Sequence, residues 1–575
     1  MDLSFYGSHN AAFTIADKGK ILEVLEVERF LNSKNMGIAQ YKTNQDILAI
    51  VPRIVKYFSD KYGVKEFDNV IHLNTDVNID EKNYDLAKKI PCKNFINKYR
   101  HHQSHAAGTF YQSPYNKALV FSFDGGGDDG KFRIFLAERK KGITHLETVA
   151  NPSLKTEDYD GTNEGNPDPG AILWQHPYDL GFPYMVLGDY FGDIQQINLG
   201  DGNLVYPGKI MGLCSYGKVR KRWVKAFKEF YLSAPHGGPT EVTYDEEGKE
   251  IQVEESLDCR LKVKILSEKI GVNLSYSNRL KGQVAYDVAA TSQYVFEELF
   301  LEIAKPYFEK YPDLPICITG GCGLNIILNT RLVQEFNKEV FVGPNPNDCG
   351  LAVGLMANHL KPKDPIDITY AGPELFDQVL LSEYIETISL EPVIKYDQTK
   401  LVEDLEKGQI IGVARDRMEH GPRALGNRSI LCNPSIKKMQ HILNEKVKHR
   451  EWYRPFAPVV RLEDVSEYFE WEGESRWMTF CPKVKKEWRK KLPSITHVDN
   501  TARVQTVTKE QNEWLYNLLT EFKEKTGVGV LLNTSFNVNG KPILNTIRDA
   551  FQILSTSQMD GLVIEDNYIK KKVWN

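Results

Sequence analysis

The chain has 575 residues, more than one hydrophobic core usually serves, so at least two domains are expected. A composition of 41% hydrophobic, 11% aromatic and 26% charged residues excludes disordered, collagen-like and coiled-coil classes. The formal net charge of −5 excludes general attraction to nucleic acid or anionic lipid, so any polyanion would bind in a local pocket.

Targeting and membrane-spanning segments are not predicted. The N-terminus lacks a basic stretch followed by an apolar one, and about 18 uninterrupted apolar residues occur nowhere. The eight cysteines form no C-x-x-C pair, which favours reduced thiols over a disulfide framework or a zinc ribbon. The sequence therefore predicts a cytoplasmic protein with no membrane partner.

Two segments far apart in the chain share one pattern. Residues 2–27 are typical of a strand, a polar turn at 7–10 and a β-hairpin. Residues 118–142 repeat that order, and Asp124 opens a turn rich in glycine. Two such copies are how the duplicated fold of actin, hexokinase and sugar kinases places a turn from each lobe around a nucleotide. Two unrelated hairpins remain the alternative at this point.

A third glycine-rich turn follows the apolar strand 316–319. Gly320 and Gly321 open this turn, and Asn325 precedes a helical stretch. Backbone N–H groups in such a turn can bind an anion, and glycine lets a base approach the chain closely. The turn comes after the two earlier ones, in the order that the duplicated fold requires.

A domain boundary is predicted near 365–395, within a segment punctuated by proline and glycine. The helix and strand pattern that begins at 402–414 would belong to the second domain. Residues 236–262 are rich in Gly, Glu and Asp and are expected to form an exposed insertion.

Four residues are candidate metal ligands. His101 and His105 are one helical turn apart, the spacing at which two imidazoles can bind one ion, although a capped or solvated helix is the alternative. Asp124 ends the next strand and Asp348 precedes a helix, where a turn former and an N-cap are the alternatives. Two imidazoles and two carboxylates suit iron(II), manganese or zinc.

Four loops near the C-terminus carry Arg or Lys beside Gly, Pro or hydroxyl-bearing residues. A guanidinium matches two phosphate oxygens, whereas Lys offers a compact charge. A surface salt bridge is the alternative for any one of these cations, but the four loops together predict an anion pocket. The basic residues concerned are Arg423, Arg428, Lys448, Arg454 and Arg503.

In these motifs the sequence resembles the carbamoyltransferases of the nodulation-factor and antibiotic type, over essentially the whole chain. The motifs are His101-His102-x-x-His105-Ala-Ala, Asp124-Gly-Gly-Gly, Gly208-Lys209-Ile210-Met211-Gly212-Leu213, Gly421-Pro-Arg-Ala-Leu-Gly-Asn-Arg428, Arg454-Pro-Phe-Ala-Pro458, Thr496-His-Val-Asp-Asn-Thr-Ala-Arg-Val-Gln505 and Asn533-Thr-Ser-Phe-Asn537. The resemblance implies a chain of α/β and α+β class. A duplicated actin/hexokinase-like (ASKHA) domain at 1–370 would precede a YrdC-like domain at 371–575.

The resemblance also implies an O-carbamoyltransferase that works in two steps. In the second domain, carbamoyl phosphate and ATP, with Mg²⁺, would give carbamoyl-AMP and pyrophosphate. The first domain, holding Fe(II) or another divalent metal, would pass the carbamoyl group to a hydroxyl of a small molecule, a sugar or a hydroxymethyl-pyrimidine nucleotide. A metal-dependent sugar kinase or hydrolase and a non-catalytic nucleotide-binding protein are the alternatives. A homodimer is compatible with the sequence, which does not fix the oligomeric state.

The matching motifs imply roles for individual residues. The metal ligands would be His101, His105, Asp124 and Asp348. Asn325 and the Gly320-Gly321 turn would lie near the adenosine. Carbamoyl phosphate and the ATP phosphates would be bound by Arg423, Lys448, Arg454, Arg503 and Ser535, with Arg428 and Lys209 as further binding residues.

His9 would lie near the acceptor and remove its proton, because an ordinary imidazole titrates near neutral pH. His9 would therefore be catalytic, together with Lys448, Arg423 and Arg503. Many relatives carry Asp after this histidine, whereas this chain has Asn10, which implies an acceptor of different charge.

Overall fold

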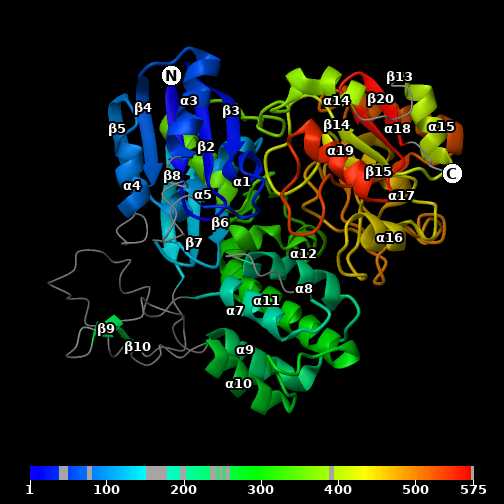
Figure 1. The fold of residues 1–575 in the computed structure, drawn as a ribbon. Helices are drawn as coiled ribbons and strands as arrows, with labels where there is room; N and C mark the ends of the chain where they lie inside the picture. Colours follow the sequence, from blue (N-terminus) through cyan, green and yellow to red (C-terminus); the bar gives the residue numbers. More distant parts are fainter. Residues whose placement is uncertain are drawn as a thin grey trace, which may run out of the picture.

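The computed structural model describes residues 1–37, 50–73, 81–127, 129–149, 178–194, 202–232, 242–244, 250–252, 259–387 and 394–571. Two five-stranded sheets form the N-terminal part, and an eight-stranded sheet forms the C-terminal part (Figure 1). Over these ranges, every helix is too short or too polar to cross a bilayer.

The first sheet has the strand order β3-β2-β1-β4-β5. Its strands are β1 (Asp2–Tyr6), β2 (Ala12–Asp17), β3 (Lys20–Glu26), β4 (Phe67–Leu73) and β5 (Cys92–Tyr99). Strands β1, β2 and β3 are antiparallel neighbours, whereas β4 and β5 run parallel to β1. The helices α3 (Ile50–Tyr62) and α4 (Glu81–Lys88) lie in the same part of the chain.

The second sheet repeats this arrangement with the order β8-β7-β6-β11-β12. Its strands are β6 (Lys117–Phe123), β7 (Phe132–Glu138), β8 (Gly142–Thr148), β11 (Ile316–Thr319) and β12 (Val340–Phe341). The first three are again antiparallel, and β11 and β12 are parallel to β6. The same strand order and directions in both sheets confirm the duplicated actin-like fold.

Two helices pack against each other between the sheets. Helix α5 (His101–Gln112) lies on the second sheet, and helix α13 (Leu351–Leu360) lies on the first. Their close approach depends on Gly354, because a Cβ there would lie 2.0 Å from the Ser104 carbonyl oxygen. This crossing fixes α5, which carries His101 and His105, against the segment that begins with Asp348.

Replacing Gly354 with alanine is therefore expected to destabilise the fold by about 1–3 kcal/mol, because two backbones would have to separate. The midpoint of thermal unfolding would measure the loss. Gly108→Ala is the matched control in the same crossing, because its Cβ would lie 3.2 Å from Gly354 Cα and the strain should be smaller. A Gly354→Ala protein as stable as the wild type would contradict this account of the crossing.

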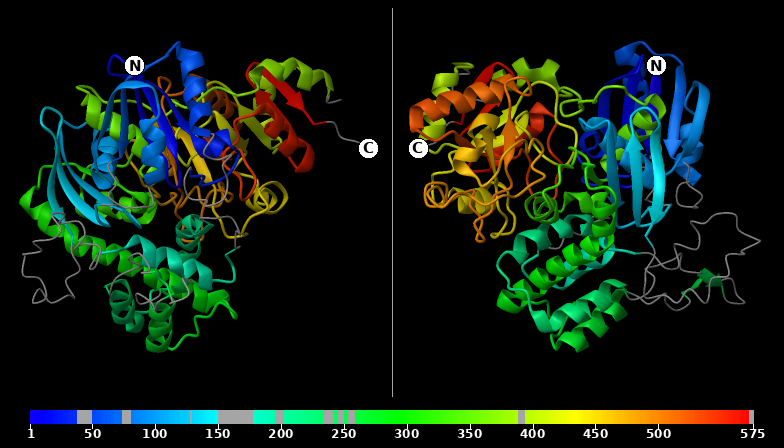
Figure 2. Two further views of the ribbon diagram at one scale, coloured as in Figure 1. Left: turned by 60° about the vertical axis from the view of Figure 1, so that its left-hand side comes forward. Right: turned by 180° about the vertical axis from the view of Figure 1, so that it is seen from behind.

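A helical layer connects the second sheet to the rest of the molecule. It contains α7 (Gly181–Val186), α8 (Tyr206–Cys214), α9 (Val224–Leu232), α10 (Cys259–Ile270), α11 (Gly282–Lys310) and α12 (Ile326–Phe336). Seen from behind in Figure 2, this layer lies below both the N-terminal sheets and the C-terminal sheet. The insertion expected at 236–262 includes an antiparallel pair, β9 (Val242–Tyr244) and β10 (Glu250–Gln252), and the start of α10; its other residues lie outside the described ranges.

The C-terminal sheet has the order β13-β20-β19-β14-β15-β18-β16-β17. Its strands are β13 (Ile394–Lys395), β14 (Ile411–Ala414), β15 (Arg428–Cys432), β16 (Ala457–Arg461), β17 (Gln505–Val507), β18 (Val530–Ser535), β19 (Gly561–Ile564) and β20 (Asn567–Lys570). Helices α15 (Gln398–Glu406) and α18 (Glu513–Thr526) share one apolar core with the sheet, and α19 (Ile547–Thr556) belongs to another. The shorter helices are α1 (Val27–Phe30), α14 (Leu381–Thr387), α16 (Met439–Ile442) and α17 (Val465–Tyr468).

Candidate functional site

The four candidate metal ligands come together. His101 and His105 lie on α5, Asp124 follows β6, and Asp348 begins a short 3₁₀ helix at Asp348–Gly350. One ligand atom from each residue lies within 4.8 Å of all the others. The His105 Nε2 atom is 3.2 Å from Asp348 Oδ1 and 3.3 Å from Asp124 Oδ2. Two imidazoles and two carboxylates at these distances fit a divalent transition-metal ion.

Backbone groups fix the carboxylate of Asp124. Its Oδ1 atom accepts a hydrogen bond from Gly125 N (2.6 Å), and its Oδ2 atom accepts one from Gly321 N (2.8 Å). The second bond requires the ends of β6 and β11 to meet closely. A Cβ at Gly320, whose φ is +83°, would lie 2.1 Å from Phe123 O, so only glycine fits there.

The electrostatics of this group favour bound positive charge. Burial alone would lower the pKa of His105, but its hydrogen bonds to Asp124 and Asp348 raise it to about 9. Burial would raise the pKa of Asp348, but His9, His101 and His105 hold it well below its ordinary value. The buried carboxylate of Asp348 and the partly buried carboxylate of Asp124 are thus stabilised by neighbouring positive charge.

His102 faces away from the ligands, as its position on the helix predicts. Its Nδ1 atom is 2.8 Å from Ser122 Oγ, and its Nε2 atom is 2.9 Å from Gly130 O. Burial lowers the pKa of His102 to about 4. This neutral imidazole therefore anchors α5 to β6 and the turn that follows β6.

Two residues of the first strand and its turn contact the outer oxygen of Asp348. The Tyr6 hydroxyl donates a hydrogen bond to Asp348 Oδ2 (2.7 Å), and His9 Nε2 lies 3.4 Å from the same atom. Asn10, with φ at 58°, brings its Oδ1 atom to 3.3 Å from His9 Nδ1. Asp348 therefore turns Oδ1 to the histidines of α5 and Oδ2 to Tyr6 and His9.

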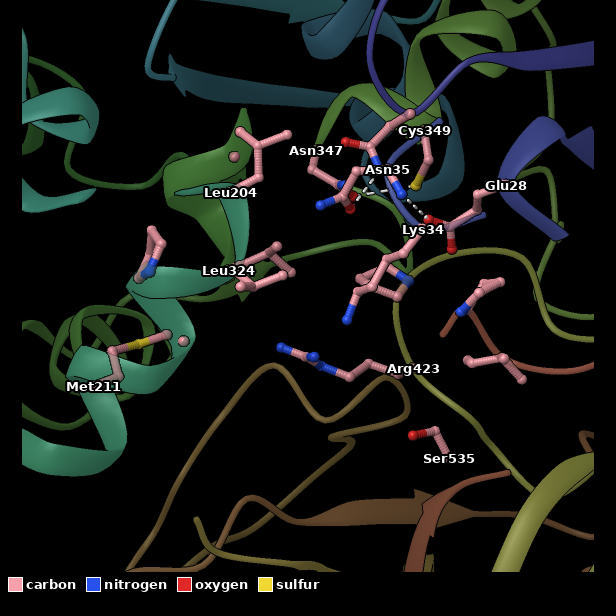
Figure 3. A pocket seen from close by; sticks show the side chains of 18 of the residues that line it. Glu28, Lys34, Asn35, Leu204, Met211, Leu324, Asn347, Cys349, Arg423 and Ser535 are labelled. Carbon is pink, nitrogen blue, oxygen red and sulfur yellow. Dashed lines mark hydrogen bonds between the residues drawn. The ribbon is translucent and has the colours of Figure 1, made fainter. Parts of the chain in front are cut away.

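One cavity of about 330 Å³ joins this group to the C-terminal part of the chain. His9, Asp124 and Asp348 lie in its wall on the N-terminal side. Cations face it from the C-terminal side: Arg423, Lys448, Arg450, Arg454 and Arg503. Figure 3 shows the side chains of Lys34 and Arg423 extending into the same part of the cavity, with Ser535 on the far side of Arg423.

Cations on the C-terminal side of the cavity lower one another's pKa. Burial and then the neighbouring Arg454 together lower the pKa of Arg423 to about 10. Burial and then Arg423 and Arg454 hold the pKa of Arg503 well below its usual range, and the Arg503 Nε atom is buried without a hydrogen-bond partner. Such mutual repulsion is relieved when a polyanion binds.

Lys448 follows a π-helical turn. Its backbone N donates to the carbonyl of Leu443 (2.8 Å), five residues earlier, after α16. Its ammonium group donates to the carbonyl oxygens of Ser535 (2.6 Å) and Asn537 (2.7 Å). A π-turn often marks a functional position, and this one directs a buried ammonium group to the cavity wall.

The loop that carries Arg423 is held by the N-terminal part of the chain. Glu26, at the end of β3, accepts a hydrogen bond from Gly421 N (2.8 Å) and lies 3.1 Å from Arg29 NH2. Arg29 donates to the carbonyls of Glu419 (2.6 Å) and Gly421. These buried contacts fix the backbone two residues before Arg423.

The opposite end of the cavity is apolar. Leu204, Met211 and Leu324 line it together with Phe296, and Figure 3 shows the first three on the side opposite Ser535. Asn325 borders this end, and its amide is fixed because its Oδ1 atom accepts a hydrogen bond from Leu328 N (3.1 Å) and its Nδ2 atom donates to Gln293 Oε1 (3.1 Å). An apolar slot beside an amide suits a nucleobase.

Most predicted site residues meet at this cavity. Those in its wall are His9, Asp124, Gly321, Asn325, Asp348, Arg423, Lys448, Arg454, Arg503 and Ser535. His101 and His105 contact the wall through Asp348 and Asp124. Gly320 lies behind Gly321 and supports the turn.

Arg428 and Lys209 do not reach the cavity wall. The Arg428 side chain is fully buried, and its guanidinium donates to Asp416 O (2.9 Å), Asn545 Oδ1 (3.2 Å) and the carbonyl of Arg415. Its donors stabilise the loop before β15, and the binding role that the resemblance implies for Arg428 stays a prediction. Lys209 pairs with Glu451 at 2.7 Å.

Several polar wall residues were not among the predicted site residues, including Glu28, Lys34, Arg450 and Asn537. Asn537 ends the recognised motif Asn533–Asn537 and Arg450 lies two residues after Lys448, so their positions were a usable signal. Lys34 follows the first hairpin in an ordinary polar turn, and nothing in its local pattern distinguishes it from a solvent-exposed lysine.

Sequence comparisons identify the family of the chain. The family described as Carbamoyltransferase N-terminus matches residues 3–357, and the one described as Carbamoyltransferase C-terminus matches residues 402–571. The nodulation protein NolNO of Sinorhizobium fredii is 30% identical over 82% of this chain and 63% of its own length. The 3'-hydroxymethylcephem-O-carbamoyltransferase of Streptomyces clavuligerus is 34% identical over 48% of this chain and 52% of its own.

Both matches span less than two thirds of the relative's length. Full-length HypF, solved in a phosphate- and nucleotide-bound form, aligns with 64% of this chain and 47% of its own at a TM-score of 0.36 and 12% identity. The fold assignment therefore rests on the two strand orders described above. The N-terminal match alone covers more than half of the sequence, and the chain belongs to the carbamoyltransferase family.

Proposed function

We propose that the protein is an ATP-dependent O-carbamoyltransferase that uses carbamoyl phosphate and acts through carbamoyl-AMP. The observation that carries this proposal is the shared cavity, which presents a cluster of cations on one side and a candidate metal group with His9 on the other. The first suits phosphate chemistry and the second suits acyl transfer. We also propose the division into an ASKHA domain at 1–370 and a YrdC-like domain at 371–575.

In the first step, water would release orthophosphate from carbamoyl phosphate and leave carbamate. A carbamate oxygen would then attack the α-phosphorus of ATP, forming carbamoyl-AMP and releasing pyrophosphate. Arg423, Arg454 and Arg503 would bind the phosphates, and Lys448 would stabilise charge on the leaving pyrophosphate. The adenosine would lie in the apolar end beside Asn325.

In the second step, His9 would accept the proton of the acceptor hydroxyl while its oxygen attacks the carbamoyl carbon and AMP leaves. A divalent ion held by His101, His105, Asp124 and Asp348, with iron(II) as our proposal, would supply Lewis acidity toward the carbonyl. Asn10 keeps His9 oriented through the contact between their side chains. The acceptor is a hydroxyl of a small molecule, a sugar or a hydroxymethyl-pyrimidine.

The test is to incubate the purified protein with ATP and Mg²⁺, with and without carbamoyl phosphate, and to measure pyrophosphate, orthophosphate and AMP. Pyrophosphate release that depends on carbamoyl phosphate is expected. Equal nucleotide turnover without carbamoyl phosphate would instead support a sugar kinase or hydrolase of the actin-like fold. ATP binding with no product in either reaction would support a non-catalytic nucleotide-binding protein.

Replacing Tyr6 with phenylalanine is expected to weaken metal binding by about 10–100-fold, because the change removes an outer hydrogen bond that orients a proposed ligand, Asp348. Titration of the metal-free protein with iron(II) or zinc measures the affinity without reference to turnover. Tyr99→Phe is the matched control, since Tyr99 lies on β5 of the same sheet, donates to Asn358 O and is outside the ligand group. Equal affinities of Tyr6→Phe and the wild type would refute this role.

A further inference from the structure

Lys209 is a buried cation that the proposed chemistry does not use directly. It lies on α8 and is 1% exposed, although its helix neighbours Gly208 and Met211 line the cavity. Its Nζ atom lies 2.7 Å from Glu451 Oε1. This ion pair joins the helical layer of the N-terminal part to the loop that follows Lys448.

Glu451 in turn contacts Arg454. The Glu451 Oε2 atom lies 3.7 Å from Arg454 NH1, and Arg454 N donates to the carbonyl of Glu451 (3.3 Å). Burial would raise the pKa of Glu451, but Arg454 and Lys209 together lower it, so the carboxylate is ionised. Lys209, Glu451 and Arg454 therefore form a chain of alternating charge that ends in the cavity wall.

The two contacts place the Glu451 carboxylate between two cations. Lys209 holds one carboxylate oxygen, so Glu451 keeps the position in which its other oxygen faces the guanidinium of Arg454. We propose that Lys209 is a positioning residue, which acts through Glu451 to keep Arg454 in its anion-binding orientation. The identity of the anion that Arg454 binds, a nucleotide with a pyrophosphate group, rests on the proposed function.

This arrangement differs from direct contact between Lys209 and phosphate in a measurable way. If Lys209 acts through Arg454, removing Lys209 has no further effect once Arg454 is absent. If Lys209 binds phosphate itself, the two losses add.

The experiment is a double-mutant cycle on the full-length protein with Lys209→Met, Arg454→Ala and the double variant. Calorimetry would measure the Kd for inorganic pyrophosphate, and the pyrophosphate-release assay would measure the KM for ATP. Lys209→Met is expected to raise the Kd roughly tenfold. In the Arg454→Ala background the same change is expected to raise it less than twofold.

A full additional tenfold rise in that background would overturn the inference, as would an unchanged Kd in Lys209→Met or a wild type that does not bind pyrophosphate. If Lys209→Met does not fold, the neutral pair Lys209→Met with Glu451→Gln replaces it in the same cycle, since it leaves no uncompensated buried charge. Because the Kd needs no turnover, a failure of carbamoyl-phosphate dependence would reject the proposed function and leave this result standing.

Discussion

Replacing Lys448 with alanine is expected to lower carbamoyl-phosphate-dependent pyrophosphate formation by about 10²–10³-fold. The ammonium group is fixed by two backbone carbonyls, so it meets the developing charge of the leaving pyrophosphate without reorganising. Burial, followed by Arg450 and Arg454, lowers the pKa of Lys448, and a bound polyanion would stabilise its charged form. The largest part of the loss should therefore appear in kcat.

The pyrophosphate assay measures this loss, and Lys446→Ala is the matched control. Lys446 lies two residues earlier, inside the π-helical turn that precedes Lys448, but its side chain is 47% exposed and pairs with Glu445. Lys448→Met, which preserves the buried volume, separates loss of charge from loss of packing. Wild-type rates in a folded Lys448→Met protein would show that Lys448 does not assist the first step.

Replacing His105 with alanine is expected to abolish stoichiometric metal binding, with affinity at least about 100-fold lower than in the wild type. The effect should exceed that of an outer partner such as Tyr6 because His105 itself joins both carboxylates. Carbamoyl transfer should fall with the metal content, whereas pyrophosphate formation should persist because the cationic side of the cavity is intact. Metal analysis tests the expected loss of the ion, and the pyrophosphate assay tests whether the first step persists.

His145→Ala is the control. His145 is an exposed residue of β8, in the sheet on which α5 packs, and it contacts Thr148. Retention of one tightly bound metal ion in His105→Ala would refute the assignment of the ligand group. Loss of pyrophosphate formation together with the metal would show that the two steps are not separately located.

The sequence was sufficient for features that are local patterns. Each of the two repeated segments, 2–27 and 118–142, is a short series of apolar runs separated by turn residues. The sheets that contain these segments have equivalent strand orders. His101 and His105 were predicted to share a helix face from their spacing alone. Asp124 and Asp348 could be added because each is attached to a recognisable turn or helix start.

What escaped prediction depends on contacts between distant segments. Tyr6 reads as one more apolar position of a buried strand, and only the fold brings its hydroxyl to Asp348, 342 residues away. Arg428 sits among other pocket residues in its motif, yet the pleat of β15 turns it inward to backbone carbonyls. No local pattern in the sequence predicts that Lys209, on α8, forms an ion pair with Glu451.

The two polar turns at 7–10 and 124–127 occupy equivalent places in the two sheets of the N-terminal part. They carry different functional groups. The first turn contributes the imidazole of His9, which lies beside Asp348, and the second contributes the carboxylate of Asp124, which is held by glycine backbone. The two sheets therefore keep the same arrangement of strands, although the turns that they carry do not have the same chemical role. Under the proposed function, exchanges at residues such as Asn10 would change the acceptor site while the turn that holds Asp124 stays unchanged.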